Sequence, residues 1–523
     1  MIDEACHCMS VGAQAVRLLF CGLGQVKKVV KQMDLEELVD GVLERFRTTS
    51  IMLHRPYPPT SSLALRSRLG GLPQLPEDVD WPMMERADGS TPLHFLAQID
   101  CAEMPEIGSG LPTTGMLFFF ADDADEQLWD DGEQGECYRV VYALEVPQDQ
   151  PCRPAPDGLP PIRGESRYSG LPDLLPGEPG PSVHTAWPVI GLRMDSWPDY
   201  AAIAETQLLY GMVINAVNGD SADNKSEARS KVGEPVEFLE GYDEAEEIIE
   251  ELEPIYDERV QACRLGALMK ATSLPTHTGL TPNWGNTIVL DNGESQLIVP
   301  YDDRSGKAPF PQLNIMINRF ARQVLRDVTQ IKRHALYQEE DKQMALGQIL
   351  DQGLYWVQQS SDHGLATSPS ERDRERFMDW IGELSDRSLP LPLAGRLPDF
   401  FKKAMLSCIE YSVGSPEVAD DIPPFVYNAL ENHHLPFTQM KKSVYATRSE
   451  WELTPRFHQM LGHVYSCQEA PSVEEEGVLL LQLYSDQGVH IDFGDAGSAQ
   501  FWIKREDLLE RRFDKAWAYV EGH

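Results

Sequence analysis

The fold is decided by two apolar runs, Leu93-His94-Phe95-Leu96-Ala97-Gln98-Ile99 and Gly115-Met116-Leu117-Phe118-Phe119-Phe120. Each run is short and rich in aromatic or branched residues, which predicts a β-strand. The second run is apolar throughout, so both faces of its strand are expected to be buried. Apolar and polar residues alternate from Cys137 to Val146, where a third strand is predicted.

The C-terminal part of the chain is also predicted to be strand-rich. Short apolar segments separated by turn residues predict strands at 478–484, 489–493, 499–503 and 516–521, with a short helix at 504–512. A strand at 186–192 and a hairpin at 283–293 are predicted by the same reasoning.

Helical periodicity is confined to other regions of the chain. It predicts helices from Asp34 to about Arg47 and from Pro198 to Val217, and an amphipathic helix with an acidic outer face from Tyr242 onward. About five helices are expected between residues 313 and 435, where prolines become sparse inside the periodic segments. The fold class predicted from these elements is α+β.

Two blocks of short motifs then carry a resemblance. The first contains Gly70-Gly71-Leu72-Pro73-Gln74-Leu75-Pro76, Trp81-Pro82, the strand that ends at Gln98-Ile99-Asp100, Leu111-Pro112 and Phe118-Phe119-Phe120. The second contains His458-Gln459-Met460-Leu461-Gly462-His463, Leu480-Leu481-Gln482-Leu483, Gly494-Asp495-Ala496-Gly497, Phe501-Trp502-Ile503 and Arg512-Phe513. Together they resemble the two ends of a YwqG-like domain, a bacterial family of unknown function, over about residues 50–147 and 455–521.

The resemblance implies a β-rich core into which a helical lobe is inserted. The expected domains are an N-terminal helical extension (1–48), the first part of the YwqG-like domain (49–312), the inserted helical lobe (313–435) and the C-terminal part of the domain (436–523). It implies no catalytic residue. The matching motif residues are expected to have structural roles: Gly71, Pro73, Trp81, Gln98, Asp100, Gly494, Asp495, Gly497 and Trp502. Genes of the family often lie near toxin systems, which implies immunity or another protein-binding role.

Charge and cysteine usage limit the classes of partner and compartment. The 83 acidic and 45 basic residues give a net charge of −38, which argues against nucleic acid or an anionic membrane as a partner. Nine scattered cysteines are typical of reduced thiols. Neither a signal peptide nor a transmembrane segment is predicted. We expect a cytoplasmic protein and leave its oligomeric state open.

The acidic residues are concentrated in two runs without any base. One spans residues 122–136 and the other spans residues 237–258. Such runs are most often solvated surface, but they could also dock a basic protein, with an aromatic residue as an anchor. The candidate partner-binding residues are Asp122, Asp123, Asp125, Trp129, Asp130, Asp131, Glu246, Glu247, Glu250 and Glu251.

A catalytic site is harder to find. If the two motif blocks adjoin, Asp100, His490, Asp492 and Asp495 could hold a metal or act as acid and base. The simpler interpretation is that Asp100 and Asp495 are turn residues. Nucleotide-binding loops and a nucleophile elbow are absent from the sequence, so no cofactor, metal or catalytic residue is expected.

Three functions remain. We favour a non-enzymatic cytoplasmic binding protein, most concretely an immunity-type inhibitor of a basic toxin. The alternative is a metal-dependent hydrolase or small-ligand-binding enzyme that uses the four residues above. A third possibility is a scaffold whose helical lobe binds a partner helix.

Overall fold

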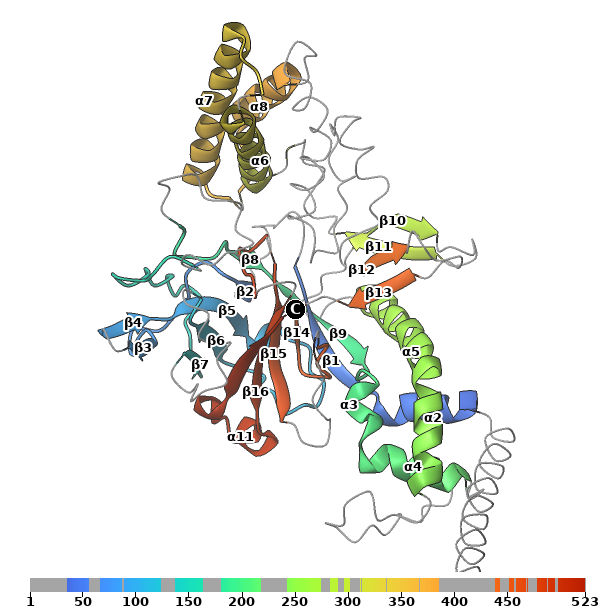
Figure 1. The fold of residues 1–523 in the computed structure, drawn as a ribbon. Coiled ribbons are helices and arrows are strands. Elements are labelled where there is room, and N and C mark those ends of the chain that lie inside the picture. The colour runs from blue at the N-terminus through green and yellow to red at the C-terminus, as the bar shows by residue number, and fades with distance from the viewer. Residues whose placement is uncertain are drawn as a thin grey trace, which may run out of the picture. The chain divides into compact units, whose positions relative to one another are not determined.

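The computed structural model describes residues 35–55, 66–86, 89–123, 137–162, 180–217, 242–273, 283–289, 296–301, 311, 313–334, 336–365, 367–384, 438–442, 451–455, 458–466, 468, 477–486, 488–493 and 497–522. The chain divides into two compact units. Unit 1 comprises residues 1–48, 196–264 and 469–476, and unit 2 comprises the remaining residues. The fold is α+β (Figure 1).

Unit 1 is helical in its described part. It contains α2 (Leu35–Phe46), α3 (Ala201–Ala204), α4 (Gln207–Val217) and most of α5 (Tyr242–Ser273). The helix predicted from residue 34 is confirmed. The helix predicted over 198–217 is broken at Thr206, because its hydroxyl accepts the N–H of Leu209 (3.2 Å) and starts a new helix there.

Aromatic side chains hold the helices of unit 1 together. The Trp197 indole donates to the carbonyl of Leu43 in α2 (3.0 Å), and the Tyr200 hydroxyl donates to the carbonyl of Ile249 in α5 (2.6 Å). Both polar groups are buried, so each bond avoids the cost of an unmet donor.

The described part of unit 2 contains two large sheets. The five-stranded sheet has the order β7 (Tyr138–Ala143), β6 (Met116–Ala121), β5 (His94–Asp100), β2 (Arg68–Leu69), β8 (Trp187–Pro188). The six-stranded sheet has the order β17 (Trp517–Glu521), β16 (Ser498–Ile503), β15 (Val478–Tyr484), β14 (Gln459–Met460), β1 (Thr48–His54), β9 (Ile190–Ser196). The strands predicted around 93–99, 115–120, 137–146, 478–484, 499–503 and 516–521 are confirmed.

The two sheets repeat one strand plan. The order β7-β6-β5-β2-β8 corresponds strand for strand to β17-β16-β15-β14-β1. In both sheets a bulge precedes a buried glutamine, Gln98 in β5 and Gln482 in β15. In both, two residues with positive φ follow the short central strand, Gly70-Gly71 after β2 and Leu461-Gly462 after β14.

The strand at the end of each copy pairs in the same way. The N–H of Val189, just after β8, donates to the carbonyl of Ser67 (3.0 Å). The N–H of Leu53 in β1 donates to the carbonyl of His458 (2.8 Å). Ser67 and His458 immediately precede β2 and β14, so they hold the same position in the two copies.

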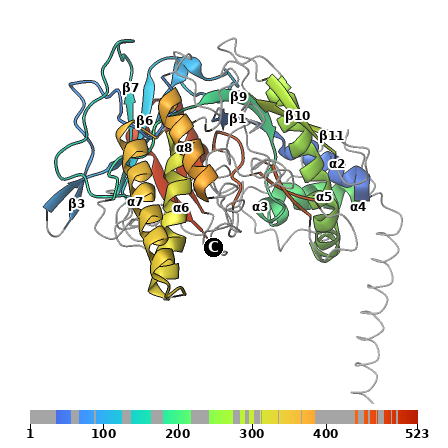
Figure 2. The same cartoon turned by 90° about the horizontal axis from the view of Figure 1, so that it is seen from above.

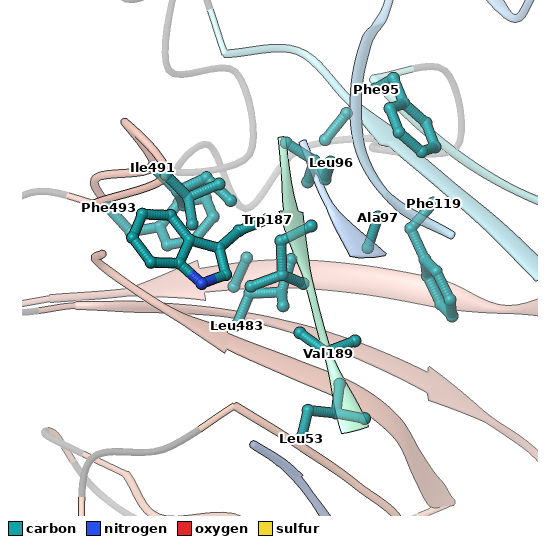
Figure 3. Packing of buried hydrophobic residues seen from close by; sticks show 14 of the residues in the cluster. Leu53, Phe95, Leu96, Ala97, Phe119, Trp187, Val189, Leu483, Ile491 and Phe493 are labelled. Carbon is teal, nitrogen blue, oxygen red and sulfur yellow. The ribbon is translucent and has the colours of Figure 1, made fainter. Parts of the chain in front are cut away.

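The two sheets pack face to face around a shared core (Figure 3). Phe119 and Phe501 each follow the residue that pairs with the buried glutamine of their own copy. Their rings contact each other, with centroids 5.2 Å apart. Contact between equivalent residues is expected when two copies of a unit are related by an approximate two-fold axis.

Three long helices and three hairpins also belong to the described part of unit 2. Helices α6 (Asn314–Arg333), α7 (Glu340–Asp362) and α8 (Glu371–Leu384) lie side by side (Figures 1 and 2). Their shared aromatic core comprises Phe320, Trp356, Phe377 and Trp380. The hairpins are β3 (Met83–Arg86) with β4 (Gly89–Pro92), β10 (Asn283–Val289) with β11 (Gln296–Tyr301), and β12 (Thr438–Lys442) with β13 (Trp451–Pro455).

One predicted strand is wrong. Residues 488–490 form a turn, Ile491 makes an isolated bridge with Asp486, and residues 492–493 are neither helix nor strand. His490 has a φ of 63°, which a strand cannot contain. The carbonyl of Val489 accepts the N–H of Thr185 (2.9 Å), so the segment is bound to the other sheet's chain instead of a neighbouring strand.

Candidate functional site

The outer face of α5 carries a dense set of carboxylates. Apolar residues at helical spacing, among them Ile248, Leu252 and Tyr256, are buried within unit 1 and fix which face is turned outward. The exposed residues of the acidic face are Glu246, Glu247, Glu250, Glu251, Glu253, Asp257 and Glu258. We call these seven residues the acidic face of α5.

The arginines near this face are already engaged. Arg259 contacts Glu36 (2.6 Å) and Asp40 of α2, and Arg264 lies 2.8 Å from Asp199. Over the described residues of unit 1, fifteen acidic residues outnumber four basic ones. Partial burial and then the carboxylates of Glu253 and Asp199 raise the pKa of Asp257, a sign of uncompensated negative charge.

The second acidic surface was predicted at residues 122–136, and its described residues are buried instead of exposed. Asp122 and Asp123 are 4% and 6% exposed, so their carboxylates belong to the interior. They follow the buried strand β6, which directs them inward. Asp125, Trp129, Asp130 and Asp131 lie outside the described residues.

Asp123 is instead part of a buried histidine cluster. Its Oδ2 lies 3.3 Å from Nε2 of His184, and its N–H donates to Nδ1 of His94 (3.1 Å). Nδ1 of His184 donates to the carbonyl of His490 (2.9 Å). Both ring nitrogens of His184 therefore face oxygen atoms of other segments.

The cluster fastens the turn at 486–491 to the five-stranded sheet. Nδ1 of His490 and Oγ1 of Thr185 are 2.9 Å apart, and His490 is 8% exposed. Nε2 of His94 donates to the carbonyl of Pro160 (2.9 Å), so His94 is neutral with its proton on Nε2. Each imidazole therefore connects two backbone segments that are distant in sequence.

The structure does not bring Asp100 together with His490. His94 begins β5 and Asp100 ends it, and seven residues of strand span about 20 Å. His490 lies with His184 at the His94 end, where the His94 and His184 ring centroids are 6.2 Å apart. Asp492 is half-buried, and Asp495 is outside the described residues.

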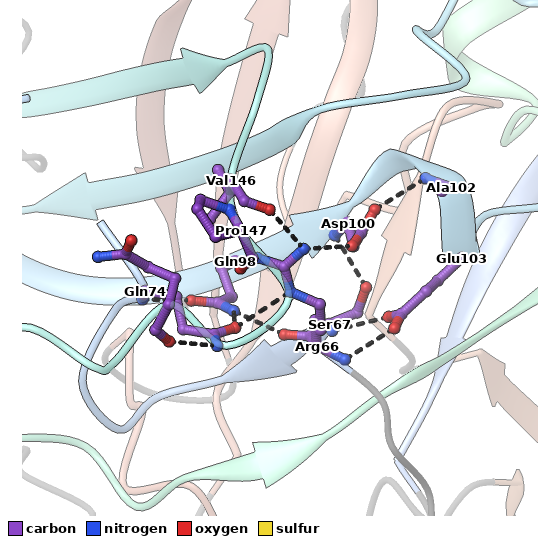
Figure 4. A network of polar contacts seen from close by, with 10 residues as sticks. Arg66, Ser67, Gln74, Gln98, Asp100, Ala102, Glu103, Val146 and Pro147 are labelled. Atoms are coloured by element: carbon purple, nitrogen blue, oxygen red, sulfur yellow. Dashed lines mark hydrogen bonds and ion pairs between the residues drawn. The ribbon is translucent and has the colours of Figure 1, made fainter. Parts of the chain in front are cut away.

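Asp100 belongs to a separate polar network around Arg66 (Figure 4). Its Oδ2 lies 3.3 Å from NH1 of Arg66, and its Oδ1 accepts the N–H of Ala102 (3.0 Å). Gln98 donates to the carbonyl of Arg66 (2.7 Å) and accepts the N–H of Gln74 (2.9 Å). Asp100 thus caps a turn, as the simpler interpretation of the sequence has it.

A third group, not predicted from the sequence, lies at the end of β1. Nε of Arg55 is 2.7 Å from Oδ2 of Asp486, and neither side chain has any exposed surface. Nε2 of His458 donates to the same oxygen (3.1 Å), while Nδ1 of His458 accepts the N–H of Tyr484 (3.2 Å). The Arg55 guanidinium stacks on Trp187, 4.2 Å from the ring centroid.

The charges in this group are stabilised by one another. Burial would raise the pKa of Asp486, but the charge of Arg55 and the His458 hydrogen bond lower it. Burial lowers the pKa of His458. The only sequence signal for this group is a charged residue, Arg55, directly after an apolar strand.

The contacts and backbone conformations of the remaining motif residues are known where the structure describes them. Gly71 has a φ of 73°, and the Trp81 indole donates to the carbonyl of Leu93 (2.9 Å). The carbonyl of Pro73 accepts the N–H of Arg153 (2.8 Å). Gly497 leaves no room for a Cβ beside Glu521 and Phe493. Trp502 is buried, and Gly494 lies outside the described residues.

The described residues contain no group of three or more His, Cys, Asp or Glu side chains suited to hold a metal ion. Within the same part of the chain, no helix combines the length and apolarity needed to cross a membrane.

The chain was compared with known proteins. No curated protein matches it. The family described as "Domain of unknown function (DUF1963)" matches residues 67–271 and 392–521. These segments contain both predicted motif blocks and leave residues 272–391 between them, whereas the resemblance placed the insertion at 313–435. The match covers more than half of the sequence, so the chain belongs to the DUF1963 family.

Proposed function

We propose that the protein is a non-enzymatic binding protein that captures a cationic protein through the acidic face of α5. The observation that carries this proposal is the number of exposed carboxylates on that face, beside arginines already paired with other acids. An uncompensated surface of one sign attracts oppositely charged proteins from a distance and accelerates their association.

The concrete form of this function is an immunity-type inhibitor that covers a basic toxin. Its support is the resemblance of the two motif blocks to YwqG-like bacterial proteins, together with the sign of the charge. The partner would present several Lys or Arg side chains with the spacing of one helical turn, because the carboxylates recur at that spacing.

The test compares two variants of the full-length protein with equal charge. In the first, Glu246, Glu247, Glu250 and Glu251 are changed to Gln. In the matched control, four exposed acids of the three-helix region are changed to their amides: Asp351, Glu375, Asp379 and Glu383. Association with purified cationic proteins of pI above 9 is measured by stopped flow at low and high salt.

We expect the α5 variant to associate at least about tenfold more slowly at low salt, and the control to behave as wild type. Salt should slow wild-type association much more than that of the α5 variant. Equal effects of the two variants would mean that only net charge matters, and the proposal would be wrong.

A further inference from the structure

A buried row of glutamines crosses the face of the six-stranded sheet that points away from the five-stranded sheet. Gln459, Gln482 and Gln500 are Cα partners on the neighbouring strands β14, β15 and β16, and all three have no exposed surface. Met52 of β1 is the Cα partner of Gln459. His54 lies two residues further along β1, on the same face, and is 1% exposed.

Several polar atoms on this face have no hydrogen-bond partner among the described residues: both ring nitrogens of His54, Oε1 of Gln459 and Nε2 of Gln500. The amide orientations are fixed by their other ends. Nε2 of Gln459 donates to Oε1 of Gln482 (2.8 Å), and Oε1 of Gln500 accepts the Trp502 indole N–H (3.2 Å). Turning either amide would therefore break an existing bond.

The strand plan does not require polar residues at the positions of His54 and Gln500, because the other sheet has apolar residues there. Val189 and Leu53 are equivalent, so Ile190 holds the position of His54. Phe118 pairs with Gln98 as Gln500 pairs with Gln482, so Phe118 holds the position of Gln500. Ile190 and Phe118 are both buried. Arg68 pairs with Gln98 as Gln459 pairs with Gln482, so the position of Gln459 is polar in both sheets. At the positions of His54 and Gln500, the same backbone is built once with apolar side chains and once with polar ones.

Unpartnered buried polar groups cost free energy, and in native proteins they are usually met by protein or by a bound molecule. We propose that His54, Gln459 and Gln500 line a buried site for a neutral molecule that carries hydroxyl groups, either a chain of ordered waters or a small polyol. A hydroxyl both donates and accepts, as these groups together demand: Gln459 offers an acceptor, Gln500 a donor, and His54 one of each.

The spacing of the groups sets the size of the guest. His54 and Gln459 are diagonal neighbours on adjacent strands, with Cα atoms about 7–8 Å apart, so one hydroxyl can contact both. Gln500 is two strands beyond Gln459, or about 10 Å. The guest must therefore supply more than one hydroxyl to reach all three side chains.

The charges around the site favour a neutral guest. Arg55 is paired with Asp486, and Glu521 accepts hydrogen bonds from the hydroxyls of Ser466 and Ser498. Burial, and then the charge of Arg55, lower the pKa of His54 to about 3, so its imidazole is neutral at pH 7. This inference is independent of the acidic face of α5, because it involves no residue of that face.

The first test is a crystal structure of the full chain at a resolution that shows ordered water. Discrete density within hydrogen-bond distance of His54, Gln459 and Gln500 would assign the guest as water. Continuous density, together with saturable heat on titration with erythritol or sorbitol, would assign a polyol. An empty site would overturn the proposal.

The second test exchanges residues between the two copies, in His54→Ile, Gln500→Phe and the double variant. His54 and Gln500 lie three strands apart, too far for their side chains to interact directly. If no guest is bound, the change in the unfolding equilibrium constant of the double variant should equal the product of the two single-variant changes to within about twofold. If a guest connects the two side chains, the double variant should differ from that product by more than about fivefold.

Ser50→Ala combined with Gln500→Phe is the matched control. Ser50 lies on the same face of β1 but its hydroxyl is bound to the carbonyl of Met194, so this pair should show no coupling. The proposal is wrong if the effects of His54→Ile and Gln500→Phe on the unfolding equilibrium constant multiply and each substitution increases the stability of the protein. In that case the polar groups have no bound partner.

Discussion

Arg55 and Asp486 are the charged residues whose loss should be felt most strongly. Both are fully buried, and Asp486 also accepts the hydrogen bond of His458 and the N–H of Gly488 (2.8 Å). Removing one partner of such a pair leaves the other charge in a medium that cannot solvate it. The pair fixes the turn that follows β15 against the end of β1.

Asp486→Asn should therefore lower the free energy of unfolding by about 3–5 kcal/mol, because it removes the carboxylate charge that faces the buried Arg55 guanidinium. Chemical denaturation with urea measures the change. Glu339→Gln, which removes the exposed partner of Lys342, is the control and should cost less than about 1 kcal/mol. Similar losses in the two variants would contradict the importance of burial.

Among the elements, the turn after β2 shows how a short strand is held in place. Gly70 and Gly71 have φ values of 57° and 73°, which favour glycine. A Cβ at Gly70 would lie 2.4 Å from the carbonyl oxygen of Thr185. The turn thus requires glycine both for its backbone conformation and for the close approach of the segment before β8.

Gly70→Ala should cost clearly more stability than Gly108→Ala. Gly108 has a φ of 74°, but nothing lies within 4 Å of the position that a Cβ would occupy there, so it measures the backbone term alone, about 1–2 kcal/mol. Gly70→Ala adds a clash with main chain that cannot move away without disturbing β8. Thermal unfolding of both variants checks the order, and equal losses would show that the turn can relax.

The elements predicted most reliably from the sequence are strands that are apolar on both faces and helices with one apolar stripe. The run at 115–120 is apolar throughout and is fully buried as β6, and the stripe of α2 is buried as its spacing indicates. Sequence reasoning missed β1, because residues 49–90 are dominated by proline and glycine signals for turns. It also missed the turn at His490, whose left-handed conformation depends on contacts with residues 184 and 185 that are remote in sequence.

The polar clusters were harder to predict than the fold. Asp100 was recognised as a turn residue, but Arg55, His184, His458 and Asp486 come from four separate regions, and only the packing of the sheets brings them together. The repeated strand plan is also hidden in the sequence, since equivalent positions hold different residues, such as Ser67 and His458. Backbone geometry preserves the plan where side-chain identity does not.

For the whole molecule, the buried residues His54 and His458 contribute to how stability responds to acid. The folded pKa of His54 is about 3 against an ordinary value of 6.5, and that of His458 is also lowered. At a pH between the folded and the ordinary pKa of such a histidine, the unfolded chain binds more protons than the folded one. Stability from these groups is therefore present above about pH 6.5 and decreases as the pH falls toward 3.

The free energy of unfolding of wild type should fall between pH 6.5 and 4.5 more steeply than that of His54→Ile, by up to about 1.4 kcal/mol per pH unit. The comparison cancels the changes in the many surface carboxylates, which both proteins share. His334→Ile replaces an exposed histidine and should leave the slope as in wild type. Parallel curves for wild type and His54→Ile would refute the assignment.

The place of β1 has a consequence for synthesis on the ribosome. All strands of the five-stranded sheet lie between residues 68 and 188, so this sheet can form while later parts of the chain are still being made. β1 is made earlier, and its two neighbours are β9 and β14, whose residues 459 and 460 follow β1 by about 400 residues. Until residues 459 and 460 are made, the edge of the apolar strand Ile51-Met52-Leu53 that faces β14 stays open, even after β9 has covered its other edge, and in this interval aggregation or chaperone binding is expected to compete with folding.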